Sequence, residues 1–181
     1  MGHHGGVASD TKTQRGRQTV RDMILSLLVV GGVAAVVYIF IPHSEGDPVR
    51  TVPYTVELAT ARRAAPYPVL APQGLPAQWR ATSVRYSADD GGHATWHLGF
   101  VTPSGSYAAV EQSDDSADGV LRAQVKGGKP DGSASVGGED WDRYQGEPYR
   151  ALVRESGGAT TVVTGSASYR ELAQLAQALH G

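Results

Sequence analysis

Residues 23–41 read MILSLLVVGGVAAVVYIFI and contain no charged side chain. At about 1.5 Å per residue, a helix of this length spans about 28 Å, close to the roughly 30 Å hydrocarbon core of a bilayer. The stretch therefore predicts a membrane-spanning helix. It divides the chain into a disordered N-terminal tail (residues 1–22), the span (23–41), a linker (42–53) and a larger domain (54–181).

A cleaved signal peptide is the alternative interpretation of this stretch. Val33 and Ala35 could occupy the small-residue positions that precede a cleavage site. The apolar run continues to Ile41, however, so a cut after Ala35 would leave an apolar new N-terminus. The chain also has no cysteine to carry a lipid. An uncleaved anchor is the favoured interpretation.

Charges on the two sides of the span predict its orientation. Four basic residues precede it, and the next basic residue after it is Arg50. Lysine and arginine next to a span tend to remain in the cytoplasm. The sequence therefore predicts a single-pass protein of the cell membrane with a cytoplasmic N-terminus and an extracytoplasmic C-terminal domain. The four basic residues are Lys12, Arg15, Arg17 and Arg21.

Composition limits what the outer domain can do. Residues 42–181 are enough to bury a core without covalent staples, and zero cysteines exclude disulfides and thiolate metal sites. Beyond the span, acidic residues outnumber basic ones. The domain therefore lacks the excess of positive charge that nucleic-acid binding usually needs, and no nucleic-acid partner is expected. The expected partners are the lipid bilayer, through residues 23–41, and an envelope protein or small ligand at the domain.

Apolar periodicity predicts an α+β domain. Ala94–Thr102 alternates most clearly, and Ser168 and Glu171 have the spacing of a capping box before the last helix. The predicted order is α-βββ-α-βββ-α, with a mostly antiparallel sheet, packed helices and an extended segment at 67–76. The helices are expected at 55–65, 119–125 and 169–180, and the strands at 78–87, 94–102, 107–112, 135–144, 149–155 and 159–164.

Several blocks together resemble a family of single-pass bacterial envelope proteins, the domain of unknown function 4245. They are YPVLAPQGLPAQW (67–79), WHLGFVTPSGSYAAVEQS (96–113), GEDW (138–141), RALVR (150–154) and TGSASYREL (164–172). No block is a catalytic motif, so the resemblance implies no activity. The strand–helix order and the LP-x-x-W segment (75–79) also look like the PsbP-like group of α/β sandwiches.

A search for catalytic or metal motifs gives no assignment. Asp114, Ser116 and Asp118 fit the start of a calcium loop, but its twelfth position is Val125 and cannot supply the required carboxylate. His93 and His97 are four apart on a predicted strand, which is not the spacing of a helical chelate. Both are interpreted as surface histidines. The sequence assigns no catalytic residue, no cofactor site and no metal site.

The resulting interpretation is a tethered, non-catalytic binding or accessory module of the envelope. Tryptophan and tyrosine in the predicted strands are expected in the sheet core, and an aromatic-lined groove stays open as a ligand site. One alternative is a structural subunit that acts through the span. The other is an enzyme whose site is assembled from scattered residues such as His97, Glu111, Asp114 and Asp140.

Overall fold

The computed structural model describes residue 2 and residues 12–40, 50–88 and 91–181, but not the side chains of residues 12–19 and 37–40. The chain divides into two compact units, Met1–Asp47 and Pro48–Gly181. Residues 1 and 3–11 of the predicted tail, residues 42–49 of the predicted linker and residues 89–90 between two predicted strands lie outside the described residues.

Helix α1 (Lys12–Phe40) is the regular element of the first unit. It begins at Lys12 rather than at Met23, so residues 12–22 are helical where the sequence predicts a disordered tail. The predicted span 23–41 is described in part, because Ile41 and the side chains of residues 37–40 are not described. Within the part of the chain that the structure describes, no helix combines the length and apolar character needed to cross a membrane.

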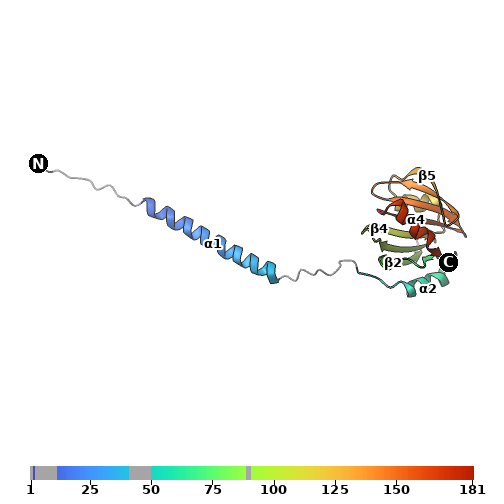
Figure 1. The fold of residues 1–181 in the computed structure, drawn as a ribbon, viewed down its shortest axis with the longest axis horizontal. Coiled ribbons are helices and arrows are strands. Elements are labelled where there is room, and N and C mark those ends of the chain that lie inside the picture. The colour runs from blue at the N-terminus through green and yellow to red at the C-terminus, as the bar shows by residue number, and fades with distance from the viewer. Residues whose placement is uncertain (1, 3–11, 41–49, 89–90) are drawn as a thin grey trace. The chain divides into compact units, whose positions relative to one another are not determined.

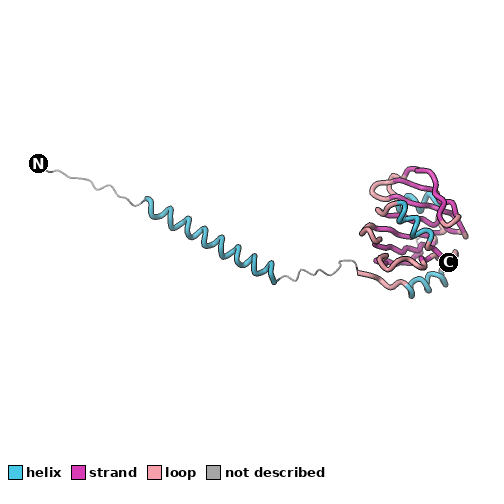
Figure 2. The backbone as a smooth tube through the Cα atoms, viewed as in Figure 1, coloured by secondary structure: helices cyan, strands magenta, loops and turns pink. Residues whose placement is uncertain are grey.

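A seven-stranded antiparallel sheet forms the second unit, in the order β2-β3-β4-β8-β7-β6-β5 (Figures 1 and 2). Each neighbouring pair is antiparallel, so the domain is α+β as predicted. The strands are β2 (Arg80–Ala88), β3 (Ala94–Val101), β4 (Tyr107–Ser113), β5 (Lys129–Val136), β6 (Glu139–Gln145), β7 (Arg150–Ser156) and β8 (Ala159–Gly165).

One face of the sheet carries the main core and is covered by α2 (Thr55–Ala64) and α4 (Tyr169–Gln177). Alternation along β3 places Trp96, Leu98 and Phe100 on this face, where each is at most 3% exposed. Leu172 and Leu175 of α4 pack into the same cluster. Full burial of each such side chain stabilises the fold by about 1.5–3 kcal/mol.

The proline-rich segment 67–79 runs across this core face of the sheet and is held there by hydrogen bonds. Tyr67 Oη lies 3.0 Å from the carbonyl oxygen of Ala94, and Trp96 Nε1 donates to the carbonyl oxygen of Leu70 at 3.0 Å. The Leu70 N–H donates to Oε1 of the buried Gln112 at 2.7 Å. The short strand β1 (Ala71–Pro72) then pairs with β9 (Leu179–His180) after α4. The segment is extended, as predicted, and partly buried.

Helix α3 (Ala117–Gln124) covers part of the opposite face. Its Val120, with Val125 just after the helix, packs on Ala151, Val153 and Val162. Ser116 caps α3 by accepting a hydrogen bond from the Gly119 N–H at 3.2 Å.

The observed element order corrects the predicted α-βββ-α-βββ-α. The predicted strand 135–144 is the end of β5, a turn at Gly137–Gly138 and most of β6. Both turn glycines have positive φ, which only glycine adopts readily. Strand β5 is exposed over most of its length and lacks the apolar alternation that would have revealed it. The likeness to the PsbP-like group stays a prediction.

Candidate functional site

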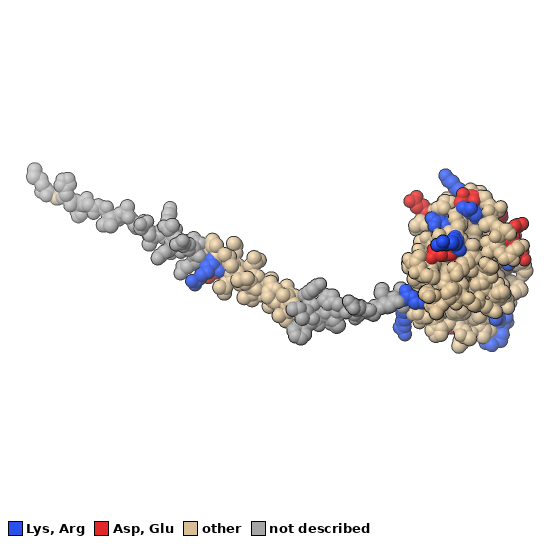
Figure 3. Space-filling model, viewed as in Figure 1, with Lys and Arg blue, Asp and Glu red and all other residues tan. Residues whose placement is uncertain are grey.

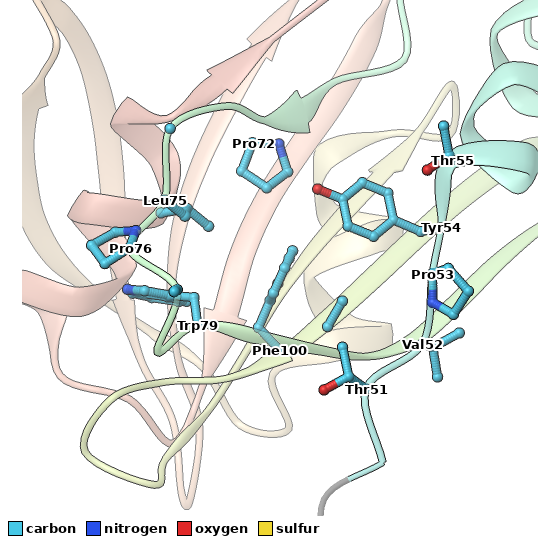
Figure 4. Close-up of a pocket in the computed structure, with 13 residues that line it drawn as sticks. Thr51, Val52, Pro53, Tyr54, Thr55, Pro72, Leu75, Pro76, Trp79 and Phe100 are labelled. Atoms are coloured by element: carbon cyan, nitrogen blue, oxygen red, sulfur yellow. The ribbon is translucent and has the colours of Figure 1, made fainter.

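An aromatic groove of about 440 Å³ opens beside the start of β2 (Figure 4). One wall is the chain at 51–55, the other is the segment 72–77, and Phe100 and Trp79 lie between them. The Val52 N–H donates to the carbonyl oxygen of Ala81 at 2.8 Å, which fixes the first wall to β2. We call this the aromatic groove. Its lining is Thr51–Thr55, Pro72, Gly74–Ala77, Trp79, Ala81 and Phe100.

Three rings line this groove in edge-to-face contact. The Tyr54 and Trp79 rings each lie 6.2 Å from the Phe100 ring, at interplanar angles of 81° and 75°. Such pairs contribute about 0.5–1.5 kcal/mol beyond their buried area, so the rings are held in place before any ligand arrives.

The aromatic groove has no charged side chain among its described lining residues. Its described lining contains no carboxylate, amine, imidazole or guanidinium group, and burial raises the pKa of Tyr54. The indole N–H of Trp79 is buried and has no hydrogen-bond partner within the described residues. A few polar groups in an apolar concavity are typical of small-ligand and peptide sites.

On the opposite sheet face, β3 and β4 bring two of the predicted enzyme residues together. His97 and Glu111 are direct cross-strand partners, with Nδ1 2.5 Å from Oε1. Their side chains are 15% and 6% exposed, so the interpretation of His97 as a surface histidine is wrong. Ser83 of β2, which the sequence did not single out, lies with Oγ 2.7 Å from His97 Nε2.

The remaining predicted candidates lie elsewhere. Asp114 accepts a hydrogen bond from the Ala94 N–H at 2.8 Å and lies 3.5 Å from His93 Nδ1. Asp140 is exposed on β6, opposite Ser135. Asp115 accepts from the Ser116 N–H at 2.6 Å, next to the capped end of α3. Among the described residues no group of three acidic, histidine or cysteine side chains is placed to hold a metal ion.

A hairpin signal could have found the His97–Glu111 pair. The two residues lie equally far along the chain from Ser104, which falls between the predicted strands 94–102 and 107–112, so a hairpin centred on Ser104 places them opposite each other. Ser83 is harder to place, because a bulge between Ala81 and Ser83 shifts the β2–β3 register. Spacing along the chain does not show such an irregularity.

Charged side chains of both signs are interspersed over the face of the domain seen in Figure 3. That face shows no broad basic patch.

These features define an α+β domain with a seven-stranded antiparallel sheet, helices on both of its faces and an aromatic groove at one edge, joined to an N-terminal helix. The chain belongs to the DUF4245 family of proteins of unknown function, which it matches over residues 15–179. No curated protein matches the chain.

Two solved structures show a distant likeness to the chain. They are MucB in complex with MucA(peri) and the MucA/MucB complex of Pseudomonas aeruginosa. Each has 13% sequence identity and a TM-score of 0.37 over 61% of this chain. The match covers 35% and 34% of those chains, about a third of their length. Likeness at this level carries no conclusion about function.

Proposed function

We propose that the chain is a membrane-anchored, extracytoplasmic binding module of the bacterial envelope, and that the aromatic groove is its ligand site. The observation that carries the binding role is the set of three rings, Tyr54, Trp79 and Phe100, preorganised around a concavity without charged groups. Aromatic rings dominate the energetics of many interfaces because they bury large areas with few rotatable bonds. Because the described lining of the groove holds no carboxylate, imidazole, amine or thiol, we assign it binding rather than catalysis.

The anchor proposal is supported by the uncharged run at residues 23–41 and by the described side chains of α1. Met23, Ile24 and Leu25 are consecutive and therefore point to different sides of the helix, and all are at least 50% exposed. A helix that is apolar all round is buried in a large core or in a membrane. The bilayer is the partner that fits such a helix.

The groove is shaped for an uncharged ligand segment with apolar surface, such as an extended apolar peptide or a lipid-like chain. Proline residues on both walls, Pro53 and Pro72, keep those segments extended. Phosphate or nucleic-acid ligands are disfavoured by the absence of a cation in the described lining.

Photocrosslinking in native membranes tests the groove. A benzophenone amino acid at Thr51, on the exposed wall, should give a discrete adduct, and the same amino acid at Glu155 of β7 should not. Tyr54→Ala should reduce the Thr51 adduct at least tenfold, which corresponds to about 1.4 kcal/mol of binding energy. Tyr86→Ala removes a partly buried tyrosine outside the groove and is the matched control. Equal adducts at both positions, or an adduct insensitive to Tyr54→Ala, would rule out the groove.

A further inference from the structure

Ser83, His97 and Glu111 form a continuous hydrogen-bonded chain across three neighbouring strands. The Ser83 hydroxyl lies 2.7 Å from His97 Nε2, and His97 Nδ1 lies 2.5 Å from Glu111 Oε1. A carboxylate can only accept a hydrogen bond. We therefore place the imidazole proton of His97 on Nδ1, the nitrogen that faces Glu111. Nε2 is then the acceptor, and Ser83 donates to it. This is the order of a nucleophile, a base and an orienting carboxylate.

Tyr107 adds a fourth group at the same point. Its hydroxyl lies beside Gly99 near the Ser83 oxygen, and this neighbour acts to lower the tyrosine pKa. Burial, with the charge of Glu111 and the neighbouring Tyr149, acts more strongly in the other direction and raises the pKa to about 12. The phenol is therefore protonated at neutral pH and can donate a hydrogen bond. Arg85 is exposed and lies opposite His97 on β2. Its positive charge acts to lower the pKa of Tyr107.

Gly99 makes the meeting of Ser83 and Tyr107 sterically feasible. It is the cross-strand partner of Ser83 on β3 and is fully buried among these groups. A Cβ at this position would collide with Ser83 Oγ and would lie 2.9 Å from Tyr107 Oη. Only glycine leaves room for both oxygens, and the side chains converge over the bare backbone.

A purely structural network would also satisfy buried polar groups, but two features point beyond that role. Ser83 is only half-buried and lies on β2, an edge strand of the sheet. The proton direction from Ser83 to His97 to Glu111 is the one that nucleophilic activation requires.

We propose that Ser83 is a nucleophile for acyl transfer from carboxylic esters, a function separate from ligand binding at the aromatic groove. His97 is the general base, Glu111 is the positioning residue that holds the imidazole, and Tyr107 donates to the developing oxyanion. The site is on the sheet face opposite the groove, so either proposal can fail without the other.

The reaction balances with an ester and water alone. Ser83 Oγ forms a bond to the ester carbonyl carbon while its proton passes to His97 Nε2. The tetrahedral oxyanion accepts a hydrogen bond from Tyr107, then collapses, and the bond to the alkoxide breaks as His97 returns the proton and an alcohol leaves. Water, deprotonated by His97, attacks the acyl carbon, the Ser83 ester bond breaks, and a carboxylic acid and the free hydroxyl are produced.

Labelling of the purified full chain in detergent with an alkyl fluorophosphonate tests the nucleophile. We expect the reagent to release fluoride and to add one phosphonyl group to each chain. The mass of the labelled peptide should place this group on Ser83. Ser83→Ala should abolish the label, and Ser87→Ala, which removes an exposed serine from the same strand, should not change it. Labelling at several serines alike, or none above the Ser83→Ala background, overturns the proposal, and the wild-type mapping needs no variant to fold.

Turnover of p-nitrophenyl acetate separates the roles of the other groups. His97→Gln should lower the rate at least 100-fold, as expected for loss of a general base, and added imidazole should restore part of the activity of His97→Gly. Tyr107→Phe should lower kcat about 100-fold, the typical effect of removing an oxyanion donor. Glu111→Gln should lower kcat with KM unchanged. Wild-type rates in His97→Gln, checked to be folded by a cooperative melt, would refute the assignment.

Discussion

At the scale of single residues, Gly99 decides whether Ser83 and Tyr107 can approach each other. We expect Gly99→Ala to destabilise the domain by about 1–3 kcal/mol, the usual cost of overpacking a core. The cost should fall when Ser83→Ala removes the oxygen that the new methyl group meets. Urea unfolding of both single variants and the double variant measures this as a coupling energy. Strictly additive costs would mean that the two residues do not share this space.

Glu171 makes the stability of the domain depend on pH. Partial burial acts to raise its pKa, but hydrogen bonds with Ser104, Thr102 and Ser168 outweigh this effect and lower the pKa to about 2, from an ordinary 4.5. A carboxylate with a lower pKa in the folded state stabilises it above pH 4.5, and this contribution is lost as the pH falls towards 2.

The expected result is that Glu171→Gln loses less stability than the wild type between pH 4.5 and 2. Thermal unfolding across this range measures the difference. Glu57→Gln, on the exposed side of α2, is the control and should follow the wild-type curve. Parallel curves for wild type and Glu171→Gln would show that the hydrogen bonds do not favour the ionised form.

At the scale of elements, α4 depends on its cap. The Glu171 N–H donates to Ser168 Oγ at 3.3 Å, and the Ser168 N–H donates to Glu171 Oε2 at 3.1 Å, which confirms the predicted capping box. We expect Ser168→Ala to cost about 0.5–2 kcal/mol of unfolding free energy. Ser135→Ala, on the exposed face of β5, should stay within about 0.5 kcal/mol. Chemical denaturation measures both, and equal effects would mean that the cap contributes nothing.

Elements with a local signal were predicted well, and those that depend on distant partners were not. Helix α2 begins at Thr55 as predicted, and β3 follows the alternation of Trp96, Leu98 and Phe100. Strand β5 was missed because its pairing with β6, rather than apolar burial, makes it a strand. The sequence left an aromatic-lined groove open as a kind of ligand site. It did not predict which rings form that groove.

The Ser83 site could not be read from motifs, because its members come from three strands and no short pattern contains them. The sequence did name His97 and Glu111 as scattered candidates. What it lacked was the register that brings them together and the bulge in β2 that places Ser83 opposite Gly99, diagonal to His97. Convergence on a sheet face is a tertiary property, so only the strand order reveals it.

At the scale of the whole molecule, the second unit should fold without the first. Pro48–Gly181 contains the complete sheet and both core clusters. A chain of this size buries about two-thirds of its unfolded surface. A fragment that begins at Pro48 should therefore be soluble and show one cooperative transition by circular dichroism. Recovery only as aggregate would mean that residues before Pro48, or an obligate partner, complete the core.

The proposed anchor predicts that the N-terminal tail before residue 23 and the C-terminal domain lie on opposite sides of the membrane. The argument rests on Lys12, Arg15, Arg17 and Arg21 before the apolar run and the lack of a basic residue after it until Arg50. Protease added to intact spheroplasts should digest a C-terminal tag and spare an N-terminal one, and both should be digested after lysis. Replacing Arg15, Arg17 and Arg21 by Gln, with two lysines inserted after Ile41, should reverse the pattern in part of the population. A C-terminal tag that stays protected in intact spheroplasts would place the domain in the cytoplasm and remove the basis for an envelope role.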